Sequence, residues 1–266
     1  MVQTKVTVPF VKNSKGIKKI VMVTAYDYPS SVLADMAGVD IILVGDSLAN
    51  VVLGYDTTIP VTVEEMLHHT KAVRRGTKNA LLVADMPFLS FHISKEETIK
   101  NAGRFLKEGG AEAVKIEGGR KRIDIIKALI DSEIPVMGHL GLTPQSFHQI
   151  GGYKIKKEEE LNEEDFIKEA VELQQAGIFS LVLECVPKNI AKKTTESLKI
   201  PTIGIGSGPF CDGQVLVFHD LIGFLPKKKY KFVREYAKVG RVILKALKKY
   251  KRDVEEGSFP TEEEAF

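Results

Sequence analysis

The residues Ala80-Leu81-Leu82-Val83-Ala84-Asp85 form a short aliphatic run that ends in a carboxylate, and this pattern recurs along the chain. Short, continuous aliphatic runs are typical of parallel strands that are buried on both faces. The runs 41–44, 113–116 and 181–183 lead in the same way to Asp46, Glu117 and Glu184. One such acid could belong to a turn. Four of them indicate that negative charge gathers at one end of a parallel sheet, where something must compensate it.

The alternation of apolar runs and helical stretches predicts the fold class. Two of the helical stretches open with capping boxes, Thr62-Val63-Glu64-Glu65 and Ser94-Lys95-Glu96-Glu97. A (β/α)8 barrel and an open, doubly wound sheet both alternate in this way. An open sheet concentrates its polar residues at one switch point, whereas here they follow at least four strands, so we predict an α/β protein with a (β/α)8 TIM barrel. The predicted strands are 20–24, 41–44, 80–84, 113–116, 136–140, 180–183, 202–205 and 214–218.

A single domain is expected over residues 1–266, because no linker or change of composition divides the chain. Residues 1–19 form an N-terminal extension. Helical pattern resumes at 230–250, so the segment 230–266 is predicted to add C-terminal helices and an irregular tail that pack on the barrel.

The composition excludes several classes of protein. A net charge of +3 on 266 residues gives no reason to expect nucleic acid as a partner. No apolar stretch reaches the length of about 18 residues that a membrane-spanning helix needs, and residues 1–19 carry no secretory signal pattern. Two cysteines cannot supply a disulfide framework. The simplest class is a cytoplasmic enzyme.

Asp46 and Asp85 are the strongest candidates for a metal site. Each lies two positions beyond its apolar run, Val44 or Val83, and the two runs are consecutive strands. Their carboxylates should therefore lie close enough to share one cation. Hard oxygen ligands suit Mg2+, and no zinc-binding spacing of His or Cys competes. The alternative, in which each Asp only caps a loop or helix, is weaker for the pair than for either residue alone.

Three further side chains lie at strand ends where they could act on a substrate. Lys115 and Glu117 share one strand face, so they form either a buried ion pair or a grip for a substrate anion beside the metal. Glu184 lies across the barrel and is placed to remove a proton from a bound substrate. His139 ends the fifth strand, where a structural and a functional role are equally consistent with the sequence.

A glycine-rich turn, Gly204-Ile205-Gly206-Ser207-Gly208, follows the seventh strand, where many barrels bind phosphate. The signal is weak, because glycines also serve tight turns. It leaves open a barrel that binds a phosphorylated ligand and performs no metal chemistry.

The chain resembles the ketopantoate hydroxymethyltransferase family over nearly its whole length. The resemblance includes Lys115-Ile116-Glu117-Gly118-Gly119 and the segment Gly138-His139-Leu140-Gly141-Leu142-Thr143-Pro144-Gln145-Ser146. Further matching segments are 24–28, 44–48, 54–62, 84–88, 151–154, 183–187, 204–206 and 212–214. The chain departs from the family pattern at Ala49-Asn50, at Lys156-Lys157 and at its last residues, Glu264-Ala265-Phe266.

This resemblance implies a barrel of the phosphoenolpyruvate/pyruvate superfamily that transfers a one-carbon unit from the co-substrate 5,10-methylenetetrahydrofolate to 3-methyl-2-oxobutanoate. The product is 2-dehydropantoate, in pantothenate biosynthesis. It further implies that family members form homodecamers of five dimers. A lyase or phosphonomutase of the same superfamily is the rival, but no catalytic Cys motif stands between residues 140 and 162.

The resemblance also assigns roles to individual residues. Mg2+ is expected on Asp46 and Asp85 with Glu117 close to it, and the metal stabilises an enolate of the keto acid. Glu184 is the expected base for the C3 proton. The remaining roles are binding of the keto acid by Asp46, Ser47, Asp85 and Lys115, and support of these groups by Tyr26 and His139.

Overall fold

The computed structural model describes residues 4–153, 157–225 and 230–266. The chain divides into two compact units, Met1–Val217 and Phe218–Phe266, and each is described by itself. Residues 1–3 of the N-terminal extension, and Lys154 and Lys156 of the family resemblance, lie outside the described residues. That the C-terminal segment packs on the barrel stays a prediction.

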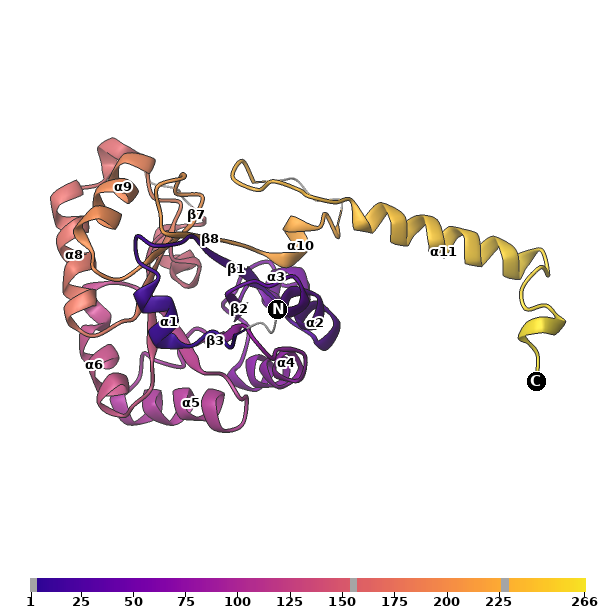
Figure 1. The fold of residues 1–266 in the computed structure, drawn as a ribbon, viewed down its shortest axis with the longest axis horizontal. Helices are drawn as coiled ribbons and strands as arrows, with labels where there is room; N and C mark the ends of the chain where they lie inside the picture. The colour runs from indigo at the N-terminus through magenta and orange to yellow at the C-terminus, as the bar shows by residue number, and fades with distance from the viewer. Residues whose placement is uncertain (1–3, 154–156, 226–229) are drawn as a thin grey trace. The chain divides into compact units, whose positions relative to one another are not determined.

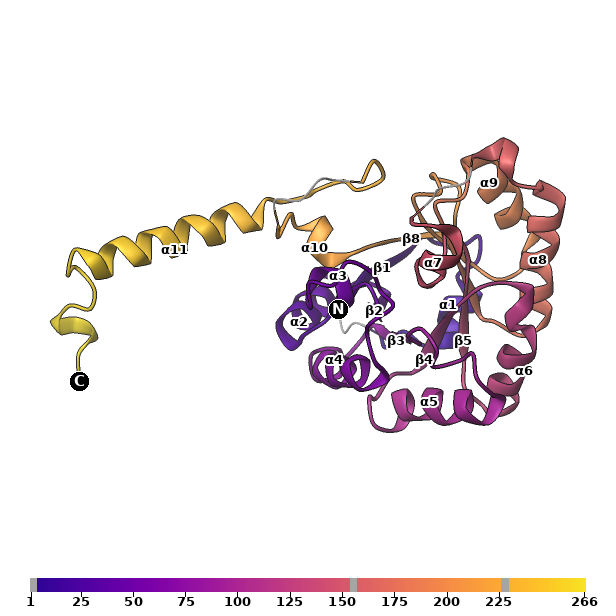
Figure 2. The ribbon, with the colours of Figure 1, turned by 180° about the vertical axis from the view of Figure 1, so that it is seen from behind.

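The first unit is a closed barrel of parallel strands, as Figures 1 and 2 show. Closure is made by β1 and β8, with Ile20 beside Gly213 and Met22 beside Val215. This pairing confirms the predicted (β/α)8 barrel and excludes the open sheet. The strands are β1 (Ile20–Thr24), β2 (Ile41–Val44), β3 (Leu81–Asp85), β4 (Ala113–Glu117), β5 (Val136–Gly141), β6 (Ser180–Glu184), β7 (Thr202–Ile205) and β8 (Gly213–Leu216).

Helices surround the strands (Figure 1). The predicted caps form: the Thr62 hydroxyl accepts from the Glu65 amide at 3.2 Å, and the Ser94 hydroxyl accepts from the Glu97 amide at 3.1 Å. These bonds satisfy amides that the first helical turn leaves unpaired. The helices between strands are α2 (Tyr28–Met36), α4 (Val63–Gly76), α5 (Lys95–Lys107), α6 (Ile123–Asp131), α8 (Glu163–Gln175) and α9 (Lys188–Ser197).

Alternate strand residues fill the barrel interior with an apolar cluster that lies on the N-terminal side of the charged strand ends. Leu81 and Val83 of β3 belong to it, as do Ala113 of β4, Met137 of β5 and Val182 of β6. Side chains on a strand point to the same face every second residue. The next inward positions toward the C-terminal ends of the strands are therefore Asp85, Lys115, His139 and Glu184. We call these four side chains the charged layer.

Several short helices were not predicted. Helix α1 (Val8–Asn13) begins at the cap residue Thr7, and its Val11 is fully buried in the apolar cluster of the barrel. The other short pieces are α3 (Leu48–Val51), α7 (Phe147–Ile150), α10 (Phe218–Leu221) and the 3-10 turns η1 (Arg120–Arg122), η2 (Pro144–Ser146), η3 (Glu158–Glu160) and η4 (Glu262–Glu264).

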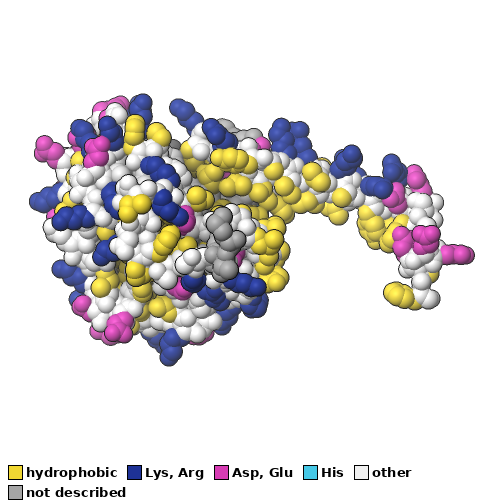
Figure 3. Space-filling view, viewed as in Figure 1, with side chains coloured by type: hydrophobic (Ala, Val, Ile, Leu, Met, Phe, Trp, Pro, Cys, Tyr) yellow, Lys and Arg dark blue, Asp and Glu magenta, His cyan; other side chains and the backbone are white. Residues whose placement is uncertain are grey.

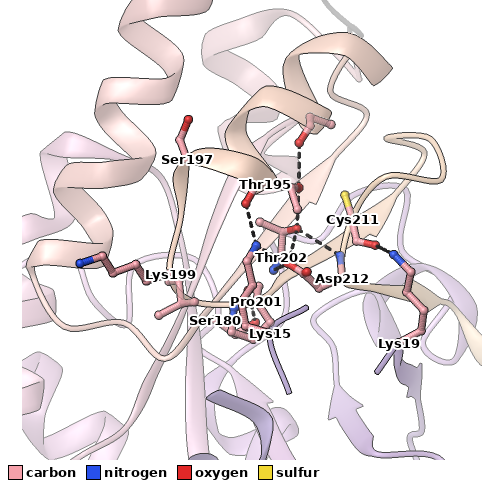
Figure 4. Close-up of polar contacts among 12 residues, drawn as sticks. Lys15, Lys19, Ser180, Thr195, Ser197, Lys199, Pro201, Thr202, Cys211 and Asp212 are labelled. Carbon is pink, nitrogen blue, oxygen red and sulfur yellow. Dashed lines mark hydrogen bonds and ion pairs between the residues drawn. The ribbon is translucent and has the colours of Figure 1, made fainter. Parts of the chain in front are cut away.

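At the N-terminal ends of the strands, Asp212 links three parts of the chain (Figure 4). Its carboxylate accepts hydrogen bonds from Lys15 Nζ at 2.7 Å and from the Thr202 amide at 2.9 Å. Lys15 also donates to the Thr195 carbonyl at 2.6 Å. This end of a (β/α)8 barrel serves stability rather than catalysis.

The second unit contains the long helix α11 (Val239–Glu255). The prediction of a helix over 230–250 was wrong at its start, because the backbone before α11 pairs with another segment: the Tyr236 amide donates to the Leu221 carbonyl at 2.9 Å. Figure 3 shows apolar side chains along this helix. Ile243, Leu247 and Tyr250 of α11 are exposed. Among the described residues, no helix combines the length and apolar character needed to cross a membrane.

Candidate active site

The charged layer begins with an ion pair between Asp85 and Lys115, which lie side by side in the register of β3 and β4. Lys115 Nζ is 2.9 Å from Asp85 Oδ1, and the two side chains are only 6% and 5% exposed. Burial acts to lower the pKa of Lys115, but the carboxylates of Asp85, Glu117 and Asp46 raise it above its usual range. Lys115 is therefore a permanent cation inside the barrel.

Asp46 joins this pair from the loop after β2. Its backbone amide donates to Asp85 Oδ2 at 3.1 Å, which fixes the loop against the end of β3. The next residue, Ser47, shares a hydrogen bond of 2.8 Å with the buried Tyr26 hydroxyl. Asp46, Ser47, Asp85 and Lys115, which the sequence predicts as one site, are thus brought together, with Tyr26 behind Ser47.

His139 connects the acids on the far side of the layer. Its Nδ1 lies 3.5 Å from Glu117 Oε1, and its Nε2 lies 3.3 Å from Glu184 Oε2. Although burial and nearby Lys115 act to lower it, the contacts with Glu117 and Glu184 raise the pKa of His139 to about 9. The two acids thus favour a protonated imidazole, whereas the Lys115 ammonium, a donor whose Nζ lies 3.3 Å from His139 Nδ1, favours a neutral one. The imidazole lies between the two carboxylates, so its position limits theirs.

Gln145 is a member of the site that the strand-end pattern did not identify. Its Nε2 donates to Asp46 Oδ2 at 2.9 Å and to the Met86 carbonyl at 3.0 Å. Its backbone amide donates to Glu117 Oε2 at 3.1 Å. Gln145 lies in the loop after β5, where only its place in the segment 138–146 that resembles the family could have indicated it.

The arrangement of charges suits a divalent cation. Burial, together with the Glu117 and Asp85 carboxylates, raises the pKa of Asp46 well above its usual value. Burial also raises the pKa of Asp85, although Lys115 acts in the opposite direction. A metal ion would remove this cost, and the buried Gln145 Oε1, which has no hydrogen-bond partner among the described residues, is one more free oxygen. Asp46 and Asp85 could therefore hold Mg2+.

Among the described residues, no three His, Cys, Asp or Glu side chains are grouped so that they could hold a metal ion. Glu117 Oε2 accepts from the Gln145 amide, and Oε1 lies 3.5 Å from His139 Nδ1 without a hydrogen bond from any described residue. Mg2+ usually keeps several waters and takes only one or two protein carboxylates, so a pair of aspartates is enough.

Gly141 allows β5 to approach the end of β6. A Cβ atom at this position would lie 2.2 Å from the Glu184 carbonyl oxygen, and the φ angle of +101° is one that favours glycine. The Leu142 amide donates to the same oxygen at 2.8 Å. The backbone of Glu184 is thus fixed from the neighbouring strand. Cys185, predicted to be core, is buried.

The glycine-rich turn after β7 is used for internal contacts. The Ser207 hydroxyl donates to the Leu183 carbonyl at 2.7 Å and accepts from the Val186 amide at 3.0 Å. Its hydroxyl therefore fastens β7 to β6, which gives a structural reason for this turn besides phosphate binding.

Comparison with known proteins agrees with the family resemblance. The sequence model of ketopantoate hydroxymethyltransferase matches residues 5–262. A 3-methyl-2-oxobutanoate hydroxymethyltransferase of Syntrophomonas wolfei is 54% identical over 98% of this chain and 95% of its own. Another, of Thermotoga maritima, is 56% identical over 96% and 94%. The solved 2,3-dimethylmalate lyase, a PEP mutase/isocitrate lyase superfamily member, has the same fold, with a TM-score of 0.62 at 15% identity over 97% of this chain and 90% of its own.

Proposed function

This chain belongs to the ketopantoate hydroxymethyltransferase family, and on that premise we propose that it converts 3-methyl-2-oxobutanoate to 2-dehydropantoate with 5,10-methylenetetrahydrofolate as the one-carbon donor. The chain is therefore a transferase. The observation that carries the mechanism is the contact of 3.3 Å between His139 and Glu184, which fixes a carboxylate beside Asp46, Asp85 and Lys115.

Glu184 is the base. It takes the C3 proton of the keto acid, and the electron pair of the broken C–H bond forms the new C–C bond to the methylene carbon as one of the two carbon–nitrogen bonds of that carbon breaks. Water then replaces the second folate nitrogen on the same carbon and supplies the hydroxyl oxygen of the product. The C3 proton and one water proton end on the two folate nitrogens, so tetrahydrofolate leaves. Glu184 has a side chain 19% exposed, so it can reach a substrate, whereas His139 at 2% is confined behind it. A positioned base contributes roughly 10²–10⁴-fold in rate.

The side chains that hold the keto acid are already in position before it binds. Lys115 offers a cation for its carboxylate, and the Tyr26 hydroxyl orients Ser47 for a hydrogen bond. Because these side chains are buried and already paired, little rearrangement is required on binding.

Mg2+ is the proposed cofactor. Asp46 and Asp85 would hold it, and Glu117 would lie close to it. When bound, it would withdraw charge from the keto acid oxygens and so make the C3 proton easier to remove. Gln145 keeps the Asp46 carboxylate turned toward the site by its hydrogen bond of 2.9 Å.

We also propose a cytoplasmic homodecamer of five dimers that requires neither nucleic acid nor membrane. The exposed apolar side chains of α11 support self-association, because such stripes commonly mark protein interfaces. Light scattering at micromolar concentration tests this, and a monomer would contradict it.

The test of function is a coupled assay with both substrates, with and without EDTA. We expect 2-dehydropantoate only with both substrates and free Mg2+. Lyase or phosphonomutase activity on 2-hydroxy or phosphono acids, without donor-dependent product, would favour the rival superfamily members instead.

A further inference from the structure

Arg122 follows β4 at the same end of the barrel as the charged layer, and no carboxylate of the described residues pairs with it. Its side chain folds back over Gly118, where a Cβ atom would lie 3.3 Å from Nε. On its other side, the guanidinium carbon is 5.3 Å from the centre of the Phe91 ring. Within the described ranges, Nε is buried without a hydrogen-bond partner, and no ion pair reaches the guanidinium. A buried N–H group without an acceptor costs free energy of folding, and a ligand that supplies the acceptor removes this cost.

The neighbouring Arg120, in contrast, forms ion pairs with carboxylates of α8. Its guanidinium reaches Asp165 at 3.1 Å and Glu172 at 2.5 Å on α8. Arg122 instead turns toward the loop that follows β3, held between a glycine and an aromatic ring. Its orientation is therefore set by packing, and its charge is left for another partner.

His92 adds a second unsatisfied nitrogen beside Arg122. Its ring packs on Phe91 at 4.1 Å between ring centres, and its buried Nδ1 has no partner among the described residues. Burial and the nearby Arg122 cation lower the pKa of His92 to about 4, although Glu117 acts to raise it. At neutral pH the imidazole is uncharged, so it can donate one hydrogen bond without adding a second cation.

The loop that carries Phe91 and His92 also exposes apolar side chains. Leu89 and Ile93 are 51% and 65% exposed. Leu89 also has a φ angle of +66°, a left-handed conformation that costs free energy in a residue with a Cβ. Apolar surface on a loop that also contacts an unpaired guanidinium fits a ligand in which a carboxylate is attached to an aromatic group.

We propose that Arg122, assisted by His92, is the subsite that receives a glutamate carboxylate of the folate donor. This inference rests on the proposed function and names the part of the donor that the subsite binds. The donor's aminobenzoyl ring then lies against the apolar loop, and its one-carbon end faces Glu184. Because the charged layer is rich in carboxylates, a cation at its edge also offsets their repulsion of an anionic donor.

The test compares two donors in Arg122→Gln and wild type. One is 5,10-methylenetetrahydrofolate, and the other is its tetrahydropteroyl amide, in which a neutral amide replaces the glutamate. Wild type should show a KM roughly tenfold or more lower for the folate than for the amide, as expected for loss of a charge-assisted pair. Arg122→Gln should raise KM for the folate by about the same factor and move KM for the amide less than about threefold. Arg122→Lys, which keeps the charge without the planar fork, should be intermediate.

Lys121→Gln is the matched control, because it removes one exposed charge from the same segment. It should change both KM values less than about twofold. Equal increases for both donors in Arg122→Gln, or no change for either, would overturn the subsite. A wild-type enzyme that uses both donors equally would do the same. Failure of wild type to use any folate donor would instead refute the proposed function itself.

Discussion

His139 Nε2 lies 3.3 Å from Glu184 Oε2, while its Nδ1 faces Glu117. One buried imidazole therefore positions the proposed base and an acid of the metal region together. We expect His139→Asn to lower kcat roughly 10–100-fold, the usual cost of losing a group that orients a ligand or base. The KM for the keto acid should change much less, because Lys115 loses its contact with His139 Nδ1 but keeps its ion pair with Asp85 at 2.9 Å. Steady-state kinetics and circular dichroism check this, and a variant with wild-type kcat would contradict the positioning role.

Asp46→Asn and Asp85→Asn should each weaken Mg2+ binding and abolish activity while the barrel stays folded. Each change removes one of two carboxylates that would hold the ion. Equilibrium dialysis measures the binding, with Asp124→Asn on the exposed side of α6 as the control. Full activity of wild type in a chelated, metal-free preparation would refute the metal assignment.

The two thiols should be unreactive in the native protein. Burial, followed by the nearby Glu184 carboxylate, raises the pKa of Cys185 to about 12, and burial also raises the pKa of Cys211. At pH 8 almost no thiolate is present, and the thiolate is the nucleophile. Ellman's reagent should therefore titrate both thiols rapidly only after guanidinium is added. Rapid reaction of either thiol in the native protein would show that its site opens.

The barrel and much of the site could be predicted because they depend on local pattern. Asp85, Glu117 and Glu184 end aliphatic runs, which places them at the same end of a parallel barrel. The two-residue period of a strand puts Lys115 and Glu117 on one face, but it did not tell whether that face points into the barrel. Gln145 could not be found this way, since its contact with Asp46 joins loops far apart in the sequence. The contact between Arg122 and Phe91 could not be predicted for the same reason.

The C-terminal helix shows a different limit. Residues 230–238 have helical pattern, yet the Tyr236 amide pairs with the Leu221 carbonyl. Tertiary hydrogen bonds override a weak local preference.

Asp212→Asn should destabilise the barrel without changing its chemistry. The carboxylate is 9% exposed and pairs with Lys15 and Thr202, so the change leaves a partly buried cation without its counter-charge (Figure 4). We expect a loss of about 1–3 kcal/mol in the free energy of unfolding. Urea denaturation measures it, with the exposed Asp131→Asn as the control. A kcat that falls along with stability would contradict the purely structural role.

Glu184→Gln separates catalysis from binding. The amide keeps the shape and hydrogen bonding of the side chain but cannot accept the C3 proton. The keto acid and Mg2+ should still bind, because Asp46, Asp85 and Lys115 are unchanged, so the dissociation constants should move less than about tenfold, or ~1.4 kcal/mol. The turnover number should fall by the roughly 10²–10⁴-fold that a base contributes. NMR in D2O without folate follows the proton directly: wild type should exchange the C3 hydrogen of 3-methyl-2-oxobutanoate, and Glu184→Gln should not. Exchange at the wild-type rate in the variant would mean that another group takes the proton, and His139 would be the first to examine.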